Sequence, residues 1–406
     1  MTSDSSSKLR LLCVINKPPT PQSSGSRVRL HHLLEGFASE FLVDTVLVGR
    51  WDESERAATQ VVTSGRVEVV RQLRCRANRP NAVLTDLLFG TRWRAWDVPA
   101  TKRLLQEYVA ATAPDVVWAS GCWAAPVLPW RAGVPIVVDL QHDERRSVVD
   151  DVLAAPTVRA LVRALSEAPA RLWAEAQVVR KATGITTAGA AVRAARTPHA
   201  VVVDNGASPL PISTRAPETG HILFVGNLHY SPNRDGIVWF LREVLPRVKS
   251  RLPFVYVSVV GDGNERLGIH APPDVRFYGF VPSLSEFYRS AEVVVAPLRR
   301  GSGTKTKVLE AMAQSVPVVT TPVGIEGLDV RHEVHILVAT TSAEFADAII
   351  DSLLHPNLSL ARARAAYVHV TSQFNWVSAQ QRSAGSVRQA AERGCWSPSG
   401  KKTRPA

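Results

Sequence analysis

The feature that most constrains this chain is an alternation, seen in both halves, of short unbroken apolar runs with longer segments of helical period. A strand that is apolar along its whole length is buried on both faces, which is typical of a parallel sheet covered by helices. The sequence therefore predicts an α/β fold of two doubly wound sheets. Strands are expected at Leu9–Ile15, Phe41–Val48, Val67–Arg71, Val116–Ala119, Pro135–Asp139, Gly184–Thr187 and Ala200–Val203, then at His221–Val225, Phe254–Val260, Val275–Tyr278, Val293–Pro297 and Val316–Thr320.

A stretch rich in Gly, Pro, Ser and Thr at residues 205–220 separates the two halves and has the composition of a linker. We expect one Rossmann-like domain over residues 1–210 and a second over 211–375. Residues 376–392 have helical composition, and 393–406 have that of a disordered basic tail. Ligands of doubly wound sheets bind beyond the carboxyl ends of the strands, so the loops there should hold the functional residues.

Composition excludes several classes of protein. With 406 residues, 45% hydrophobic and 21% charged, the chain is globular in type and long enough for two or three cores. The four cysteines are far apart and form no CxxC pair, which argues against a disulfide scaffold and a classical zinc site. No secretory signal or long apolar span is evident, so the sequence predicts a cytoplasmic protein.

The net charge of +12 favours anionic partners, which include nucleic acid, anionic lipid and phosphorylated substrates. The clearest basic cluster is residues 71–103, where Arg92 and Arg94 alternate with Trp93 and Trp96. Three interpretations stay open for it. We favour a helical hairpin packed on the first domain, then peripheral contact with the inner face of an anionic membrane, and then single-stranded nucleic acid, which we do not expect as a partner.

The stretch from Val293 to Thr321 carries the most chemistry. A buried strand leads into a glycine-rich turn, and a helix opens directly after it. Glycines allow a close backbone approach, and the first amides of a helix favour an anion such as phosphate. Lys307 and Glu310 are three residues apart, so they share a helix face and suit a phosphate and a ribose diol. The alternative is an ordinary surface ion pair of about 0.2–0.5 kcal/mol.

This stretch, PLRRGSGTKTKVLEAMAQSVPVV, resembles the donor-nucleotide motif PLRxGSGTRxKVLEAMAxGxPVV in a subgroup of the family 4 glycosyltransferases, which have the GT-B fold. Further segments agree in order and spacing, so that the resemblance extends from about Leu9 to Gln389. They are the loop around Gly25, the loop with His142, the turn at Gly226 and Asn227, and the turn at Phe280 and Val281.

The resemblance implies a retaining, metal-independent transfer from a nucleotide-diphosphate sugar, with no cofactor besides that donor substrate. It implies that the first domain binds the acceptor and the second the donor across a cleft, and that the helix over 376–392 crosses back to the first domain. The acceptor would be a glycan, a lipid-linked molecule or a secondary metabolite. The base would contact the backbone at Phe280 and Val281, Glu310 would hold the ribose, and the diphosphate would meet Lys307 and the amides of Gly301, Ser302, Gly303 and Thr304.

Other predicted site residues have competing interpretations. Gly226, Asn227 and Arg234 are expected to bind the donor, but Arg234 is equally well an exposed residue at a helix start. His142 follows a strand that ends in Asp139, so we expect it in the cleft as a catalytic residue, the alternative being a structural histidine. Gly25 is assigned to the catalytic region rather than to a plain helix start.

One departure from the family pattern stands out. Many members carry a glutamate eight residues before the position of Glu310, and this chain has Ser302 there. Three other functions therefore stay open: a nucleotide-sugar epimerase or phosphorylase of the same fold, a non-catalytic nucleic-acid-binding protein, and a degenerate subunit that depends on a partner.

Overall fold

A computed structural model describes residues 8–19, 25–49, 53–63, 67–71, 98–153, 155, 157–193, 197, 199–209, 215–269, 272–301 and 303–394. The chain divides into two compact units. Unit 1 runs to Asp204 and resumes at Val377, and unit 2 spans Asn205–Trp376. The division therefore falls a few residues before the expected boundary at 210. The last helix continues to Gly394, past its expected end at 392. Residues 395–406 lie outside the described part, so the disordered tail stays a prediction.

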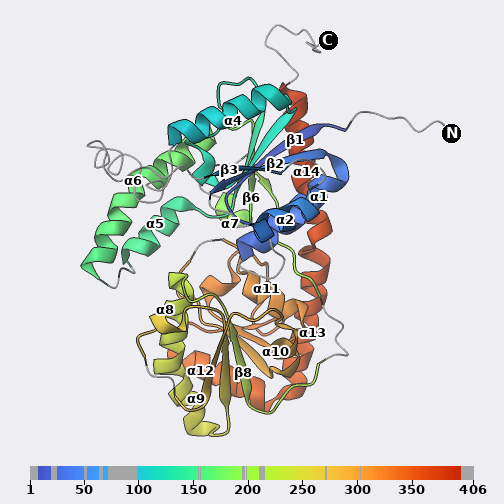
Figure 1. Ribbon diagram of the computed structural model, residues 1–406. Coiled ribbons are helices and arrows are strands. Elements are labelled where there is room, and N and C mark those ends of the chain that lie inside the picture. Colours follow the sequence, from blue (N-terminus) through green and yellow to red (C-terminus); the bar gives the residue numbers. More distant parts are fainter. Residues whose placement is uncertain are drawn as a thin grey trace, which may run out of the picture. The chain divides into compact units, whose positions relative to one another are not determined.

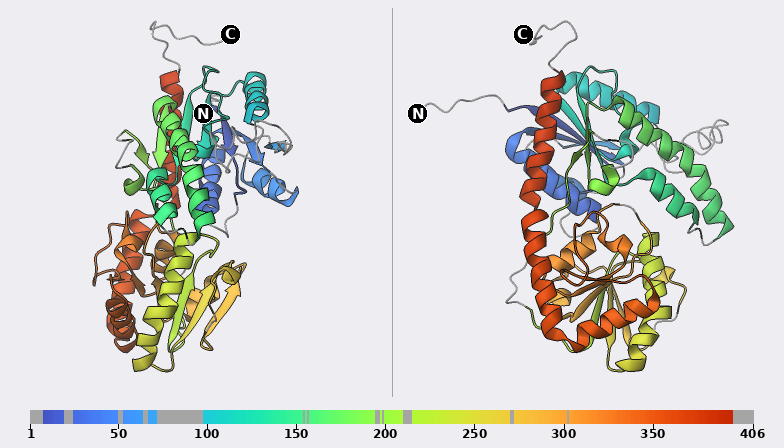
Figure 2. Two further views of the ribbon diagram at one scale, coloured as in Figure 1. Left: turned by 90° about the vertical axis from the view of Figure 1, so that its left-hand side faces the viewer. Right: turned by 180° about the vertical axis from the view of Figure 1, so that it is seen from behind.

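Unit 1 is built on a parallel sheet of seven strands in the order β3-β2-β1-β4-β5-β6-β7. The sequence forms these strands because runs such as LLCVI are wholly apolar, and Leu11 to Ile15 are fully buried. Helices α1 and α14 cover one face and α4 and α6 the other (Figures 1 and 2). The strands are β1 (Arg10–Ile15), β2 (Leu42–Gly49), β3 (Val67–Arg71), β4 (Val116–Ser120), β5 (Ile136–Leu140), β6 (Gly184–Thr187) and β7 (Val201–Val202).

The helices of unit 1 fill the connections between these strands, as the alternating sequence pattern predicts. They are α1 (Gly25–Glu40), α2 (Glu53–Val62), α4 (Val98–Thr112), α5 (Glu144–Leu153), α6 (Val158–Lys181), α7 (Ala190–Arg193) and α14 (Trp376–Gly394). The basic cluster at 71–103 lies mostly outside the described residues, so its three interpretations stay predictions. None of the helices within the described ranges is long and apolar enough to cross a membrane.

Unit 2 has a parallel sheet of six strands in the order β10-β9-β8-β11-β12-β13. Helices α8, α9 and α12 pack on one face through residues such as Ile237 and Phe345, while α10, α11 and α13 pack on the other through residues such as Leu309. The strands are β8 (His221–Val225), β9 (Tyr256–Val260), β10 (Val275–Gly279), β11 (Val293–Ala296), β12 (Val318–Thr320) and β13 (Leu337–Val338). The helices are α8 (Ser231–Trp239), α9 (Leu245–Arg251), α10 (Ser285–Ser290), α11 (Thr306–Ala313), α12 (Ser342–Leu354) and α13 (Pro356–Gln373).

The order of strands in unit 2 decides where a ligand can approach. Strand β8 lies between β9 and β11. The chain runs from β8 through β9 to β10 at one edge of the sheet, then returns to β11 on the other side of β8 and continues toward the opposite edge. At such a reversal, the loops after the two central strands diverge and leave a crevice at the carboxyl edge. The loops after β8 and β11 contain Gly226 and the glycine-rich turn, so the fold brings two separately predicted segments to adjacent strand ends.

Candidate functional site

The glycine-rich turn links β11 to α11. Gly301 has φ of 117° and Gly303 has φ of 81°, a region of backbone conformation that residues with a Cβ rarely adopt. Both glycines are buried. The turn therefore depends on glycine at these two places. Ser302, which the motif also assigns to the donor, lies outside the described residues.

Lys305 fixes the shape of this turn. Its side chain is only 7% exposed, and Nζ donates hydrogen bonds to the carbonyl oxygens of Gly301 (3.0 Å) and Gly303 (2.7 Å). The C=O and N–H of a trans peptide point in opposite directions, so the bond to Gly303 turns the N–H of Thr304 away from the ammonium group. Sequence reasoning missed Lys305; its only signal was a basic residue at this place in the motif.

Lys307, in the first turn of α11, reaches across to the loop after β8. Its Nζ donates to Oδ1 of Asn233 at 2.6 Å and lies 4.7 Å from the centre of the Phe224 ring. Burial lowers the pKa of Lys307 to about 7, with the Glu310 carboxylate opposing that shift and the Lys305 ammonium adding to it. The ammonium therefore lacks the negative charge that would hold its proton firmly.

Glu310 lies one turn further along α11, and its pKa is shifted in the opposite direction. Burial raises the pKa of Glu310 to about 7, against the opposing effects of the Tyr288 hydroxyl and of Lys307. The hydroxyl of the buried Tyr288 donates to Oε2 of Glu310 at 3.4 Å. The pKa values of this cation and this carboxylate are both shifted so as to favour the uncharged forms. Such shifts mark a polar site at which the protein compensates the two charges incompletely.

The loop after β8 is shaped to receive the Lys307 side chain. A Cβ at Gly226 would lie 2.7 Å from Nζ of Lys307 and 2.8 Å from Nδ2 of Asn233, so a side chain there would displace the ends of both residues. Asn233 is 7% exposed, and its Nδ2 donates to the carbonyl oxygen of Asn227 at 2.8 Å. Asn233, in the first turn of α8, thus connects the loop after β8 to Lys307 of α11, although sequence reasoning gave it no role.

The other predicted residues of this loop have mainly structural contacts. Nη1 of Arg234 donates to the carbonyl oxygen of Leu228 at 3.3 Å, which ties the half-buried guanidinium to the loop. Asn227 is exposed, and its Oδ1 accepts a hydrogen bond from the backbone N–H of His229 at 2.8 Å. Their assignment to the donor stays a prediction.

The turn after β10 presents Phe280 and Val281. The backbone N–H of Phe280 donates to Oδ1 of Asp262 at 2.8 Å, and the Phe280 side chain is 59% exposed. That amide is therefore engaged within the protein and can meet a base only if Asp262 releases it. The main chain of Val281, which is half-buried, is still expected to contact the base.

Unit 1 holds the remaining predicted residues. Gly25 is the first residue of α1, and His142 is an exposed residue between β5 and α5. The structure also shows a buried pair that sequence reasoning missed. Arg29 donates to both carboxylate oxygens of Asp139, from Nε at 2.9 Å and from Nη2 at 2.7 Å, and its Nη1 donates to the carbonyl oxygen of Val203.

In the part of the chain that the structure describes, one group of side chains has the spacing to hold a metal ion. His31, His32 and Glu35 of α1 bring their ligand atoms within 4.8 Å of one another. Two of these groups already contact each other, since His32 Nδ1 lies 3.4 Å from Oε2 of Glu35, and Gln380 donates to the same oxygen. The group belongs to unit 1 and contains none of the residues predicted to bind the donor.

Comparison with known proteins identifies unit 2. Residues 219–355 match the family described as Glycosyl transferases group 1. The matched residues lie within unit 2. A curated relative, an uncharacterized 44.6 kDa protein from the cps region of Klebsiella pneumoniae, is 28% identical over 141 residues. That match covers 32% of this chain and spans 36% of the relative.

Solved structures resemble this chain in fold. The Anabaena protein HepE in complex with UDP and glucose has a TM-score of 0.64 at 17% identity, covering 94% of this chain and 100% of that one. Sucrose-phosphate synthase from Thermosynechococcus elongatus has a TM-score of 0.68 at 16% identity, covering 95% and 100%. These likenesses confirm the predicted α/β fold of two doubly wound domains, which is that of GT-B proteins.

Proposed function

We propose that this chain transfers a sugar from a nucleotide-diphosphate sugar to an acceptor hydroxyl, with the donor held by unit 2. The observation that carries the proposal is the pair of half-buried, oppositely charged groups beside the glycine-rich turn. A diphosphate would bring Lys307 the negative charge that the protein does not supply. A ribose diol would bring Glu310 two hydroxyl donors.

The same groups explain how the domain would assist the reaction. As the bond between sugar and diphosphate breaks, negative charge grows on the departing phosphate oxygens. We expect Lys307 and the backbone amides of the glycine-rich turn to face that place; Asn233 holds the Lys307 side chain, and Lys305 bonds the carbonyl oxygens of Gly301 and Gly303. Preorganised donors of this kind stabilise a transition state without reorganising as the charge develops, typically by a few kcal/mol each.

The finer parts of the proposal follow from the family resemblance. They are membership of family 4, retention of the anomeric configuration, independence of a metal ion and a cytoplasmic location. Gly25 and His142 of unit 1 are proposed to meet the sugar and the acceptor. The group 1 match over residues 219–355 supports a nucleotide sugar as the donor, and the HepE structure with UDP and glucose has the same fold.

A thermal-shift panel of nucleoside mono- and diphosphates and their sugars tests the proposal. A ligand at 100 times its Kd should stabilise the protein by about 2.7 kcal/mol, and we expect diphosphates to exceed monophosphates. Glu310→Ala should remove about half of the shift, since a tenfold loss of affinity costs about 1.4 kcal/mol. Asp347→Ala provides the control, because this exposed acid of unit 2 pairs only with a surface arginine in the contacts described. Equal shifts with mono- and diphosphates would exclude the diphosphate site.

A further inference from the structure

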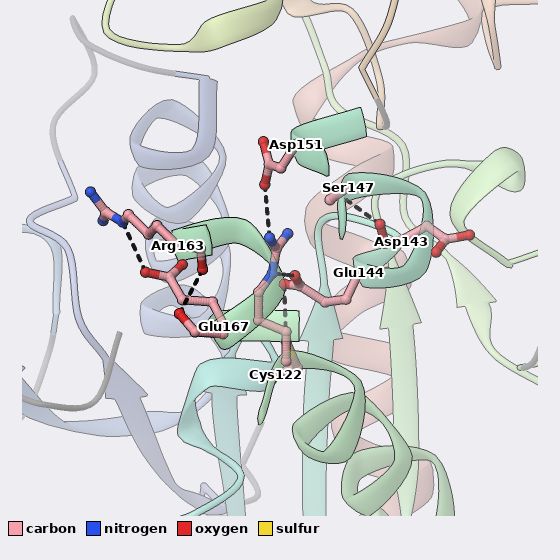
Figure 3. A network of polar contacts seen from close by, with 9 residues as sticks. Cys122, Asp143, Glu144, Ser147, Asp151, Arg163 and Glu167 are labelled. Carbon is pink, nitrogen blue, oxygen red and sulfur yellow. Dashed lines mark hydrogen bonds and ion pairs between the residues drawn. The ribbon is translucent and has the colours of Figure 1, made fainter. Parts of the chain in front are cut away.

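Helices α5 and α6 form a hairpin that extends from the sheet of unit 1 (Figures 1 and 2). Charged groups hold it together from within. Arg171 of α6 is 8% exposed and donates to Glu144 at 2.7 Å and to Asp151 at 2.8 Å, both on α5 (Figure 3). Sγ of Cys122 donates to the other oxygen of Glu144 at 3.2 Å. Arg171 therefore ties the two helices of the hairpin together from their facing sides.

Large apolar side chains occupy the opposite, outer face of α6. Steps of four, three and then eight residues along α6 place them on one side of that helix. A helix at the surface of a water-soluble domain normally turns its apolar stripe inward, so this arrangement is inverted. We call these side chains the outer stripe: Val158 (78% exposed), Val162 (59%), Leu165 (54%) and Trp173 (41%).

The end of α5 extends this apolar surface. Leu153 is 81% exposed and Val149 is 53% exposed, and they are four residues apart on the same side of α5. Isolated exposed apolar residues are common, but a run of them over two packed helices marks a surface that meets another apolar phase.

The exposed charges of the hairpin are mainly basic. Asp151 is the one acidic residue of α5 and α6 that is classed as exposed, and it already pairs with Arg171. Arginine can extend an apolar stem along a surface while its guanidinium reaches phosphate oxygens. The exposed basic residues are Arg145, Arg159, Arg163, Arg180 and Lys181.

We propose that the α5–α6 hairpin docks on the surface of an anionic phospholipid bilayer. The outer stripe would enter the boundary between headgroups and acyl chains, where tryptophan is favoured, and the arginines would contact lipid phosphates. A surface for a second copy of the chain would need matched charges of both signs beside the stripe, whereas the exposed charges here are mostly positive. This contact is separate from the one considered for residues 71–103.

Vesicle flotation of the full chain tests the proposal. We expect binding to phosphatidylcholine vesicles that contain phosphatidylglycerol, and weak binding to phosphatidylcholine alone. Replacing Val158, Val162 and Leu165 by Ser together should lower the partition coefficient at least about tenfold. The matched control replaces Leu354, Leu358 and Val368 of unit 2 by Ser, residues that are 53%, 59% and 65% exposed. The control should bind vesicles like the parent.

A charge variant and an assembly measurement complete the test. Replacing Arg145 and Arg159 by Glu should reduce binding to the anionic vesicles and leave the thermal transition unchanged, since both residues are exposed. Vesicle binding by the serine variant equal to that of the parent would overturn the proposal. So would a parent that ignores anionic vesicles but forms a dimer in light scattering, with the serine variant monomeric, because the stripe would then pair two copies of the chain.

Discussion

Each unit carries a cation and a carboxylate near the carboxyl ends of its strands, fully buried in unit 1 and half-buried in unit 2, and the two pairs differ in how completely their hydrogen-bonding groups are satisfied. In unit 1, Arg29 and Asp139 form two direct hydrogen bonds, and Thr186 and the carbonyl oxygen of Val203 occupy further positions around them. In unit 2, Lys307 donates to an uncharged amide oxygen, and Glu310 accepts a long hydrogen bond from Tyr288.

The comparison separates a structural pair from a site prepared for a ligand. A guanidinium matches a carboxylate in a planar, bidentate contact, so the Arg29 pair needs nothing from outside. An ammonium is a compact charge, and burial without a matching anion shifts the pKa of Lys307 and that of Glu310 toward neutrality. Perturbed groups of this kind concentrate where a protein binds or transforms another molecule.

The largest effect should come from breaking the satisfied pair. Arg29→Met leaves the Asp139 carboxylate buried without its partner, so unit 1 should lose about 3–5 kcal/mol of stability. Urea unfolding measures this loss. The double variant Arg29→Met, Asp139→Leu should recover a large part of it, because it removes both charges. Unfolding at the parent's urea concentration in both variants would contradict a structural role for the pair.

Breaking the unsatisfied pair should affect turnover more than folding. Lys307→Ala removes the ammonium that meets the growing charge on the diphosphate, so transfer should slow about 10²–10³-fold. Binding of the bare nucleoside should change much less, since that ligand carries no phosphate. Steady-state rates and calorimetry with the nucleoside separate the two effects, and an equal loss in both would refute the diphosphate role.

The lowered pKa of Lys307 predicts a dependence of stability on pH. Between about pH 7 and 10.5 the unfolded chain binds a proton that the folded site does not, so this residue makes stability rise with pH over that range. Below pH 7 the folded protein bears the full cost of a buried ammonium. Lys307→Met should therefore stabilise unit 2 by roughly 1–3 kcal/mol in mildly acidic solution, with the gain shrinking toward high pH.

Urea unfolding of parent and variant at several pH values checks this expectation. The raised pKa of Glu310 acts in the opposite direction, because from about pH 4.5 to 7 the folded state binds the extra proton and stability falls as pH rises. Glu310→Gln should flatten that fall. A Lys307→Met variant that is less stable than the parent near neutrality would show that the ammonium is well compensated.

The smallest effect concerns the ribose. Glu310→Ala removes the proposed acceptor for two hydroxyls, and donor-nucleotide binding should weaken about tenfold, or about 1.4 kcal/mol. A 2′-deoxy nucleotide should lose affinity for the parent and little further for the variant. Calorimetry with both ligands measures the coupling, and an equal discrimination in parent and variant would place the ribose elsewhere.

The sequence predicts the fold well because its signal is local. A run such as VVVA specifies a strand buried on both faces whatever follows it, and the predicted strand ends lie within a few residues of β1, β8 and β11. Lys307 and Glu310 could be found for the same reason, since three residues on a helix fix a common face.

The remaining parts of the site depend on contacts between distant segments. Lys307 meets Asn233, which is 74 residues away, and Arg29 meets Asp139 across 110 residues. No pattern in one sequence links such positions. Lys305 was missed for a different reason: a lysine at the start of a helix is usually solvated, and only the folded turn shows its ammonium bound to two carbonyl groups.

The position of helix α14 in the sequence determines which of the two units can finish folding first. Its Gln380 donates to the carbonyl oxygen of His32 and its Arg388 pairs with Glu40, so the last helix finishes a layer whose other parts were synthesised more than three hundred residues earlier. During translation, unit 2 can therefore fold before α14 has been made, whereas unit 1 is complete only after α14 has been added. A shortened chain without α14 should therefore lose stability first in unit 1, where α14 contacts α1.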